Sequence, residues 1–214
     1  MTLKAVFWDF GGVFTSSPFE AFNRYEHARG LPPDFIRHVN STNPDTNAWA
    51  QLESGKISVE HFDKLFVEES RQLGHAVPGI DILSLLDGDI RPRMVAALRT
   101  VKSHYPVACL TNNVKDAGNG PGMARDKAKA DALAEIIELF EFVLESSAAG
   151  LRKPEPGFYE LALEKAGVEA SEVLFLDDLG INLKPARAMG MTTIKVVSEE
   201  QALAELADAL QLDL

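Results

Sequence analysis

The segment that most constrains the fold is a short apolar run, residues 5–8 (AVFW), which ends at Asp9 and is followed by Gly11 and Gly12. The run is too short for a helix and has no helical period, so it predicts a fully buried strand of a parallel sheet. Glycines allow the backbone to turn sharply and to approach a ligand closely. Ligands of open α/β sheets bind outside the carboxyl ends of the strands, so Asp9 is a candidate site residue. The plain alternative is an ordinary acidic residue at a strand end.

The C-terminal half of the chain repeats this pattern. Apolar runs at residues 107–110, 142–144 and 173–176, and a fifth predicted strand at residues 192–197, alternate with amphipathic helical segments. An alternation of strands and helices indicates right-handed crossovers and an α/β fold with a doubly wound parallel sheet.

Residues 16–87 contain helical patterns and nothing that reads as a strand. Ser58 precedes a strongly amphipathic helix, and Asp34 is expected to cap a shorter one. The sequence therefore predicts an α/β core formed by residues 1–15 and 88–214, with residues 16–87 inserted as an all-helical cap.

Residues that carry chemistry follow the predicted strands. They are Asp9 after the first strand, Thr111 and Asn112 after the second, Lys153 beyond the third, and Asp177 and Asp178 after the fourth. The carboxyl ends of parallel strands share one edge of the sheet, so we expect these side chains to lie in one crevice.

The composition of that crevice points to phosphate chemistry. Three crowded carboxylates repel one another unless a proton or a cation lies among them. An all-oxygen ligand set without histidine favours Mg²⁺, and Mg²⁺ favours a phosphate substrate. Lys153 and the Thr111 hydroxyl can donate to phosphate oxygens, while Asp9 can act as a nucleophile that forms an aspartyl-phosphate.

Four separated motifs resemble those of the haloacid dehalogenase-like (HAD) superfamily. They are residues 7–13 (FWDFGGV), 110–112 (LTN), 153–156 (KPEP) and 175–178 (FLDD) followed by Asn182. Residues 175–187 are also similar to the N-terminal phosphatase domain of soluble epoxide hydrolase. The helical insert matches the cap that this family places between its first and second motifs.

The resemblance implies a role for each matched residue. Asp9 would be the nucleophile and a metal ligand, Asp178 the second carboxylate on Mg²⁺, and Asp177 and Asn182 supporting residues. The main-chain carbonyl of Gly11 would also bind Mg²⁺. Thr111, Asn112 and Lys153 would hold the transferring phosphoryl group, with Lys153 counted among the catalytic residues.

Gly11 departs from the family pattern. Phosphatases of this family usually carry at that position an aspartate that protonates the leaving group and later activates water. General acid–base catalysis contributes about 10²- to 10⁴-fold in rate. A substrate whose leaving group needs no protonation, or a relay through water or a substrate hydroxyl, would compensate.

Three functions follow from these features. The first is a Mg²⁺-dependent phosphatase of a small phosphorylated metabolite. The second is a non-catalytic or highly selective binding protein on the same fold, because Gly11 replaces the usual acid. The third, a metal-independent haloacid dehalogenase, ranks lowest because Asp177 and Asp178 are hard to explain without a cation.

The net charge of the chain limits the classes of molecule that it can bind. The chain of 214 residues has a formal net charge of −11, which argues against nucleic acid or an anionic membrane as a partner. With no apolar run long enough to span a bilayer and no targeting segment, a cytoplasmic protein is expected.

The single cysteine, Cys109, lies in an apolar run and is interpreted as a core residue. The glycine-rich loop Asp116–Gly122 is either a cover for the substrate or a surface excursion. The sequence predicts no particular oligomeric state.

Overall fold

The computed structural model describes residues 2–113 and 127–214, and it contains a five-stranded parallel sheet. The strands are β1 (Ala5–Trp8), β2 (Val107–Thr111), β3 (Phe142–Glu145), β4 (Val173–Asp177) and β5 (Thr192–Lys195). Their order in the sheet is β3-β2-β1-β4-β5, and every pairing is parallel. The predicted doubly wound α/β fold is confirmed.

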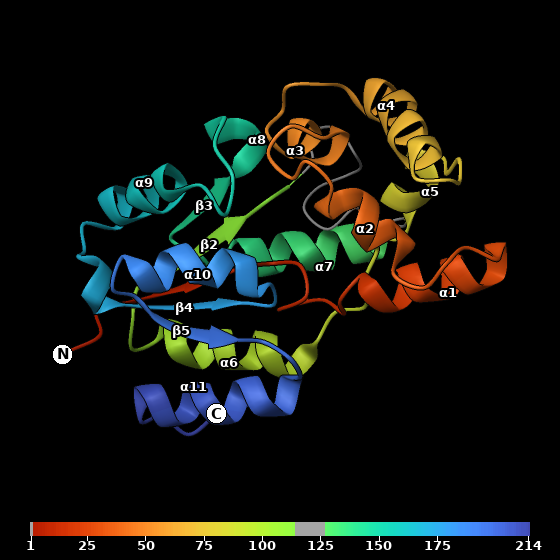
Figure 1. Ribbon diagram of the computed structural model, residues 1–214. Coiled ribbons are helices and arrows are strands. Elements are labelled where there is room, and N and C mark those ends of the chain that lie inside the picture. The colour runs from red at the N-terminus through yellow and green to blue at the C-terminus, as the bar shows by residue number, and fades with distance from the viewer. Residues whose placement is uncertain (1, 114–126) are drawn as a thin grey trace.

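Helices cover both faces of this sheet, as Figure 1 shows. On one face lie α6 (Pro92–Lys102), α7 (Lys127–Ile137) and α11 (Glu199–Leu210); on the other lie α9 (Pro156–Ala166) and α10 (Gly180–Ala188). The short helices α8 (Ser146–Ala149) and η1 (Ala170–Glu172) lie in the connections that follow β3 and precede β4. The helix predicted over residues 123–140 ends at Ile137, while residues 123–126 and the loop 116–122 lie outside the described residues.

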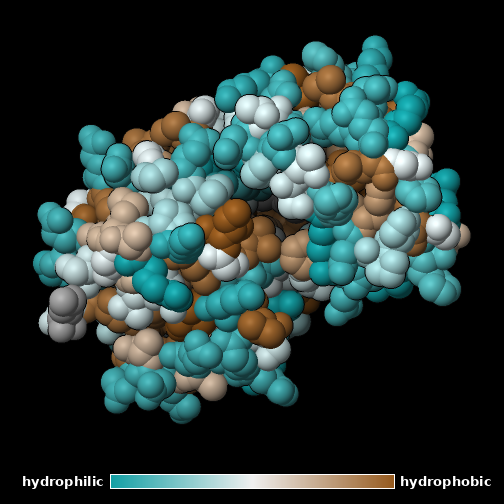
Figure 2. Space-filling model, viewed as in Figure 1, coloured by the Kyte–Doolittle hydropathy of each residue, from teal (hydrophilic) through white to brown (hydrophobic). Residues whose placement is uncertain are grey.

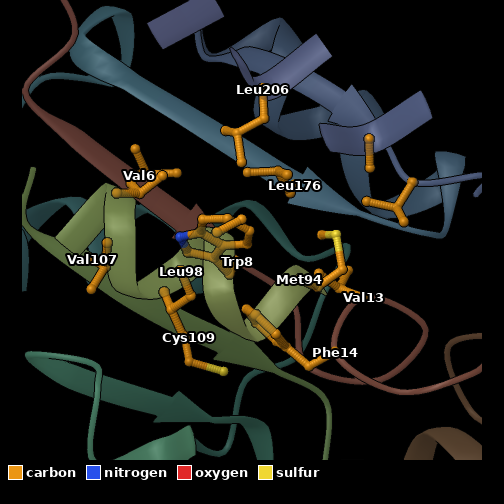
Figure 3. Close-up of a cluster of buried hydrophobic side chains, with 14 of the residues drawn as sticks. Val6, Trp8, Val13, Phe14, Met94, Leu98, Val107, Cys109, Leu176 and Leu206 are labelled. Atoms are coloured by element: carbon orange, nitrogen blue, oxygen red, sulfur yellow. The ribbon is translucent and has the colours of Figure 1, made fainter. Parts of the chain in front are cut away.

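The double cover explains why the strands read as continuous apolar runs. In β1, Val6 and Trp8 pack into the cluster shown in Figure 3, together with residues of α6 and α11. Ala5 and Phe7 point to the other face and pack against α9 and α10. Because both faces are covered by helices, the alternation of side chains leaves no polar position. Cys109 is fully buried in the first cluster, as predicted.

A helical insert lies between β1 and β2, as predicted. It comprises α1 (Phe19–Arg29), α2 (Phe35–Ser41), α3 (Ala48–Glu53), α4 (Val59–Gln72) and α5 (Gly79–Ser84). Its helices bury a hydrophobic core of their own, in which Phe62 and Phe66 are fully inaccessible to solvent. Ser58 caps α4 by accepting a hydrogen bond from the His61 N–H, as expected.

The start of α2 differs from the prediction. Asp34 takes left-handed backbone angles (φ 61°) and its side chain makes no capping hydrogen bond. The carboxylate of Glu26 on α1 instead accepts the N–H groups of Asp34 and Ile36, each at 2.9 Å. The prediction of an Asp34 cap was therefore wrong, because a buried carboxylate from the preceding helix already satisfies these donors.

The two connections between the helical insert and the core run side by side. Thr15 and Ile90 form an isolated antiparallel bridge, and the Ser16 N–H donates to the Asp89 carbonyl at 2.8 Å. The Asp89 N–H donates to the Ser16 hydroxyl at 3.0 Å. The two connections are therefore paired with each other, and this paired segment lies just beyond the end of β1 that is followed by Asp9. Among the residues that the structure describes, no helix has the length and apolarity to cross a membrane.

Candidate active site

Three carboxylates meet where the order of the strands reverses. β1 and β4 are neighbours, with Trp8 opposite Leu176, so Asp9, directly after β1, lies beside Asp177, the last residue of β4. The Asp9 N–H continues the pairing by donating to the Leu176 carbonyl at 2.8 Å. One carboxylate oxygen from each of Asp9, Asp177 and Asp178 lies within 4.8 Å of the others. The predicted acidic crevice therefore forms at the switch point, where ligands of such sheets bind.

Lys153 lies between two of these acids. Its ammonium nitrogen is 2.7 Å from Asp9 Oδ1 and 2.7 Å from Asp177 Oδ2, and its side chain is only 1% exposed. Such a buried ammonium requires paired, hydrogen-bonded partners, which the two carboxylates provide. The Lys153 side chain therefore holds the Asp9 carboxylate in one orientation.

Asp177 is in turn held by several donors. Asn182 Nδ2 lies 3.1 and 3.0 Å from its two oxygens, and the Leu179 N–H donates to Oδ1 at 2.8 Å. Tyr159 donates its hydroxyl hydrogen to the Asn182 carbonyl at 2.7 Å. Asp177 is fully buried, so its oxygens are committed to protein donors and it orients Lys153.

The electrostatics of the site favour bound cations. Burial raises the pKa of Asp9 well above its usual value, and the charges of Asp177 and Asp178 add to this effect while Lys153 opposes it. Burial and the Asp177 charge raise the pKa of Asp178 to about 7. The two carboxylates raise the pKa of Lys153 despite its burial, so it remains an ammonium ion. A further cation near Asp9 and Asp178 would relieve the repulsion that remains.

The two glycines of the first motif differ in what they require. Gly12 has φ +73°, and a Cβ there would lie 2.2 Å from Asp178 Oδ2. Arg91, directly after the paired connections, donates to the Gly12 carbonyl at 2.7 Å, and its charge partly opposes the rise in the pKa of Asp178. A Cβ on Gly11 would meet no atom within 4 Å. Only Gly12 is therefore required by the backbone and by the close approach of Asp178.

Thr111 and Asn112 of the second motif have different surroundings. Thr111 is buried at the end of β2, and its hydroxyl makes no hydrogen bond to the residues that the structure describes. The Asn112 side chain instead binds the main chain of Lys153, accepting from its N–H at 2.9 Å and donating to its carbonyl at 2.9 Å. The Asn112 amide thus joins the end of β2 to the segment that carries Lys153.

The helical insert reaches this site through Glu53 at the end of α3. Its Oε2 accepts from Arg152 at 2.8 and 3.0 Å and from Asn112 Nδ2 at 3.3 Å, while Oε1 accepts from Trp49 Nε1 at 2.8 Å. Arg152, the chain neighbour of Lys153, thus pairs with a carboxylate of the insert. On the face viewed in Figure 2, a hollow lies between the insert and the core.

Sequence reasoning did not single out Glu53 or Arg91. Glu53 is separated from Arg152 by 99 residues and lies beside no recognisable motif. Arg91 immediately precedes a helix and is 79 residues from Gly12, whose carbonyl it binds. No local pattern predicts either contact, because each joins residues that are far apart in the sequence and meet only after the chain has folded.

The residues of the crevice fit a hard divalent cation. The donors are carboxylate oxygens, their burial and mutual repulsion raise two of the pKa values, and no histidine or cysteine belongs to the cluster among the described residues. Oxygen-only donor sets suit Mg²⁺. Asp9 and Asp178 would hold such an ion, because Asp177 is already bound by Lys153 and Asn182.

Comparison with known proteins agrees with this geometry. The chain is 34% identical to bifunctional epoxide hydrolase 2 of Mus musculus over 96% of its own length, but it spans only 38% of that relative. It is 28% identical to a sesquiterpene phosphatase of Aspergillus oryzae, covering 96% of this chain and 95% of that protein. A solved HAD family enzyme from Bacteroides thetaiotaomicron, in complex with magnesium and inorganic phosphate, has a TM-score of 0.57 at 22% identity, covering 90% of this chain and 93% of that one.

A family model gives the same assignment over most of the chain. It describes a haloacid dehalogenase-like hydrolase and matches residues 3–190, a range that includes all of the strands except β5. The acids after β1 and β4, Lys153 and the helical insert all fall within the matched range. The chain therefore belongs to the haloacid dehalogenase-like hydrolase family.

Proposed function

We propose that this protein is a Mg²⁺-dependent phosphatase that acts on a small phosphorylated molecule, with Asp9 as the nucleophile. The observation that supports this most is the arrangement of Lys153 at 2.7 Å from both Asp9 and Asp177, beside the oxygens of Asp178. The names of the relatives support it too, since one is a phosphatase and a structural neighbour was solved with magnesium and phosphate.

In the proposed reaction, an oxygen of Asp9 attacks the phosphorus atom. The bond between phosphorus and the leaving oxygen breaks, and an aspartyl-phosphate forms on Asp9. Water then attacks phosphorus, which returns the Asp9 carboxylate and releases inorganic phosphate. Lys153 orients Asp9 and offers positive charge to the phosphoryl oxygens, while the Thr111 hydroxyl and the Asn112 main-chain N–H hold them.

Mg²⁺, held by Asp9, Asp178 and the Gly11 carbonyl, would supply positive charge that offsets the charge on the phosphoryl oxygens. Asp178 has little freedom in this arrangement, because Gly12 lies directly against it. Asp177 and Asn182 act indirectly, since they fix the position of Lys153.

Gly11 defines which substrates suit this site. No side chain at position 11 can protonate a leaving group, so the leaving oxygen must depart as an anion or take its proton from water or from the substrate. The site therefore favours phosphate esters whose leaving groups are weakly basic. The missing acid at position 11 also fits a second function, that of a binding protein with the HAD fold and little or no turnover.

Hydrolysis of p-nitrophenyl phosphate, with and without Mg²⁺, tests the proposal. Its leaving group barely needs an acid, so the missing side chain at position 11 matters least. Asp9→Asn should abolish turnover, whereas Asp208→Asn on α11, an exposed aspartate of the same type, should leave it unchanged. Absence of turnover by a folded, Mg²⁺-binding protein favours the binding reading. Metal-independent halide release from a 2-haloacid favours the dehalogenase reading.

A further inference from the structure

One insert side chain is built into the core beside the catalytic groups. The Glu53 carboxylate, 12% exposed, accepts hydrogen bonds from Arg152, Asn112 and Trp49. Trp49 belongs to the insert, whereas Arg152 and Asn112 belong to the core. Both oxygens of Glu53 therefore accept hydrogen bonds, and most of the donors belong to the core.

The two core partners of Glu53 are the immediate supports of Lys153. Arg152 is its neighbour in the chain, and the Asn112 amide makes two hydrogen bonds to the Lys153 main chain. The Lys153 ammonium then binds Asp9 and Asp177. A continuous set of hydrogen bonds thus runs from the insert to the proposed nucleophile.

The end of α3 is closely seated on the core. The Ser146 hydroxyl donates to the Glu53 carbonyl at 2.6 Å, and Arg152 Nη1 donates to the Pro44 carbonyl in the insert at 3.0 Å. A Cβ on Gly55 would lie 2.8 Å from the Ser147 carbonyl oxygen, so the chain there has no spare room. A buried ion pair in such a seat is costly to break by removal of one partner.

We propose that Glu53 is a positioning residue that places Lys153 for catalysis only while the helical insert is seated on the core. This inference rests on the proposed function and adds a condition to it. With Glu53 in place, its carboxylate holds Arg152, the chain neighbour of Lys153, and Asn112, whose amide binds the Lys153 main chain. When the insert lifts, these contacts of Glu53 break together, and the segment that carries Lys153 loses this support.

The test compares four variants with the wild-type protein. Glu53→Gln keeps the size of the side chain but replaces one acceptor oxygen with a donor group that faces donors. Arg152→Gln breaks the same contact from the core side, and the double variant tests whether the two act as one unit. Glu69→Gln is the matched control, because Glu69 also binds α3, but through the Ala48 N–H, a hydrogen bond that lies within the insert.

Two readouts and one control measurement are made on each variant. The first is kcat and KM for p-nitrophenyl phosphate. The second, which needs no catalytic activity, is the acetylation rate of Lys153 relative to Lys165, an α9 residue that serves as an internal reference, by peptide mass spectrometry. The reactivity of Cys109, fully buried in β2, reports whether the core itself has opened.

Glu53→Gln and Arg152→Gln should each lower kcat about 10- to 100-fold with a smaller change in KM, as expected for a misplaced catalytic group. Relative acetylation of Lys153 should rise severalfold while Cys109 stays unreactive. The double variant should be no worse than the poorer single variant, because both changes break one unit. Glu69→Gln should match the wild type in both readouts.

Unchanged Lys153 acetylation in Glu53→Gln and Arg152→Gln would overturn the inference, as would additive losses of kcat in the double variant. A rise in Cys109 reactivity that parallels the rise at Lys153 would also overturn it, because the loss would then come from opening of the core. If the wild-type protein does not hydrolyse the substrate, the proposed function fails, while the acetylation measurement still decides the role of Glu53.

Discussion

Gly12 is the residue at which backbone geometry and site chemistry depend on each other most directly. Its positive φ disfavours any other residue, and Asp178 occupies the space that a side chain would need. Gly11, its neighbour, has neither constraint, since its φ lies outside the left-handed region and the space around it is open.

Gly12→Ala should therefore displace Asp178 and lower kcat by about 100-fold, because a shift of about 1 Å is enough to cost that much. Steady-state kinetics with p-nitrophenyl phosphate measure the effect. Gly11→Ala is the paired control and should keep most of the wild-type activity. Equal losses in the two variants would mean that the contact with Asp178 is not the reason for the glycine at position 12.

The open space at Gly11 permits a gain of function. Gly11→Asp would place a carboxyl group where the family usually carries its general acid, and the space around its Cβ is open. For an alkyl phosphate, which needs a protonated leaving group, kcat should rise by up to about 10²-fold. For p-nitrophenyl phosphate it should change little. A similar change for both substrates would show that the added group does not act as an acid.

At the scale of elements, the start of α2 depends on a carboxylate from α1. Glu26 is 2% exposed and accepts two main-chain N–H groups. Glu26→Gln leaves one of these donors without a good acceptor and should lower the stability of the insert by about 1–3 kcal/mol. Hydrogen exchange of α2 measures this, with Glu20→Gln, an exposed change on the same helix, as the control. Equal protection of α2 in both variants would contradict the account.

The sequence predicted the elements whose pattern is local. β1, β2 and β4 could be read because helices cover both faces of the sheet, which makes each strand a continuous apolar run. Asp9 and Asp177 could be placed together because parallel strands share one edge.

Contacts between distant elements could not be predicted in this way. The Glu26 cap replaced the expected Asp34 cap, and the pairing of Glu53 with Arg152 crosses from the insert to the core. Each depends on two elements that meet only after folding, and a glutamate in a helix otherwise reads as a solvent-exposed residue. The open space at Gly11 likewise depends on how the surrounding segments fold, which no local pattern shows.

For the whole molecule, ionisation of the carboxyl groups in the acidic crevice lowers the stability of the folded protein when no metal is bound. The pKa of Asp178 is about 7 in the folded protein against 3.8 as the ordinary value, so the folded state binds its proton more tightly than the unfolded state does. Stability from this group is therefore full below about pH 4 and is lost as pH rises towards 7. The raised pKa of Asp9 acts in the same direction.

Metal-free Asp178→Asn should thus be more stable than the wild type at pH 8, and the difference should shrink towards pH 5. Thermal unfolding with and without Mg²⁺ measures this, and Mg²⁺ should raise the Tm of the wild type more at pH 8 than at pH 5, because protons compete with the metal. Parallel pH profiles for wild type and variant would show that Asp178 does not titrate in this range.

The most direct test of the account is to trap the phosphorylated enzyme. The protein is mixed with p-nitrophenyl phosphate and Mg²⁺, quenched in acid within a turnover, and digested for mass spectrometry. The account predicts one phosphoryl group on the peptide that contains Asp9, removable by hydroxylamine and absent from Asp9→Asn. Release of phosphate at the wild-type rate with no phosphoryl group on Asp9 at any quench time would contradict the central claim that Asp9 is the nucleophile.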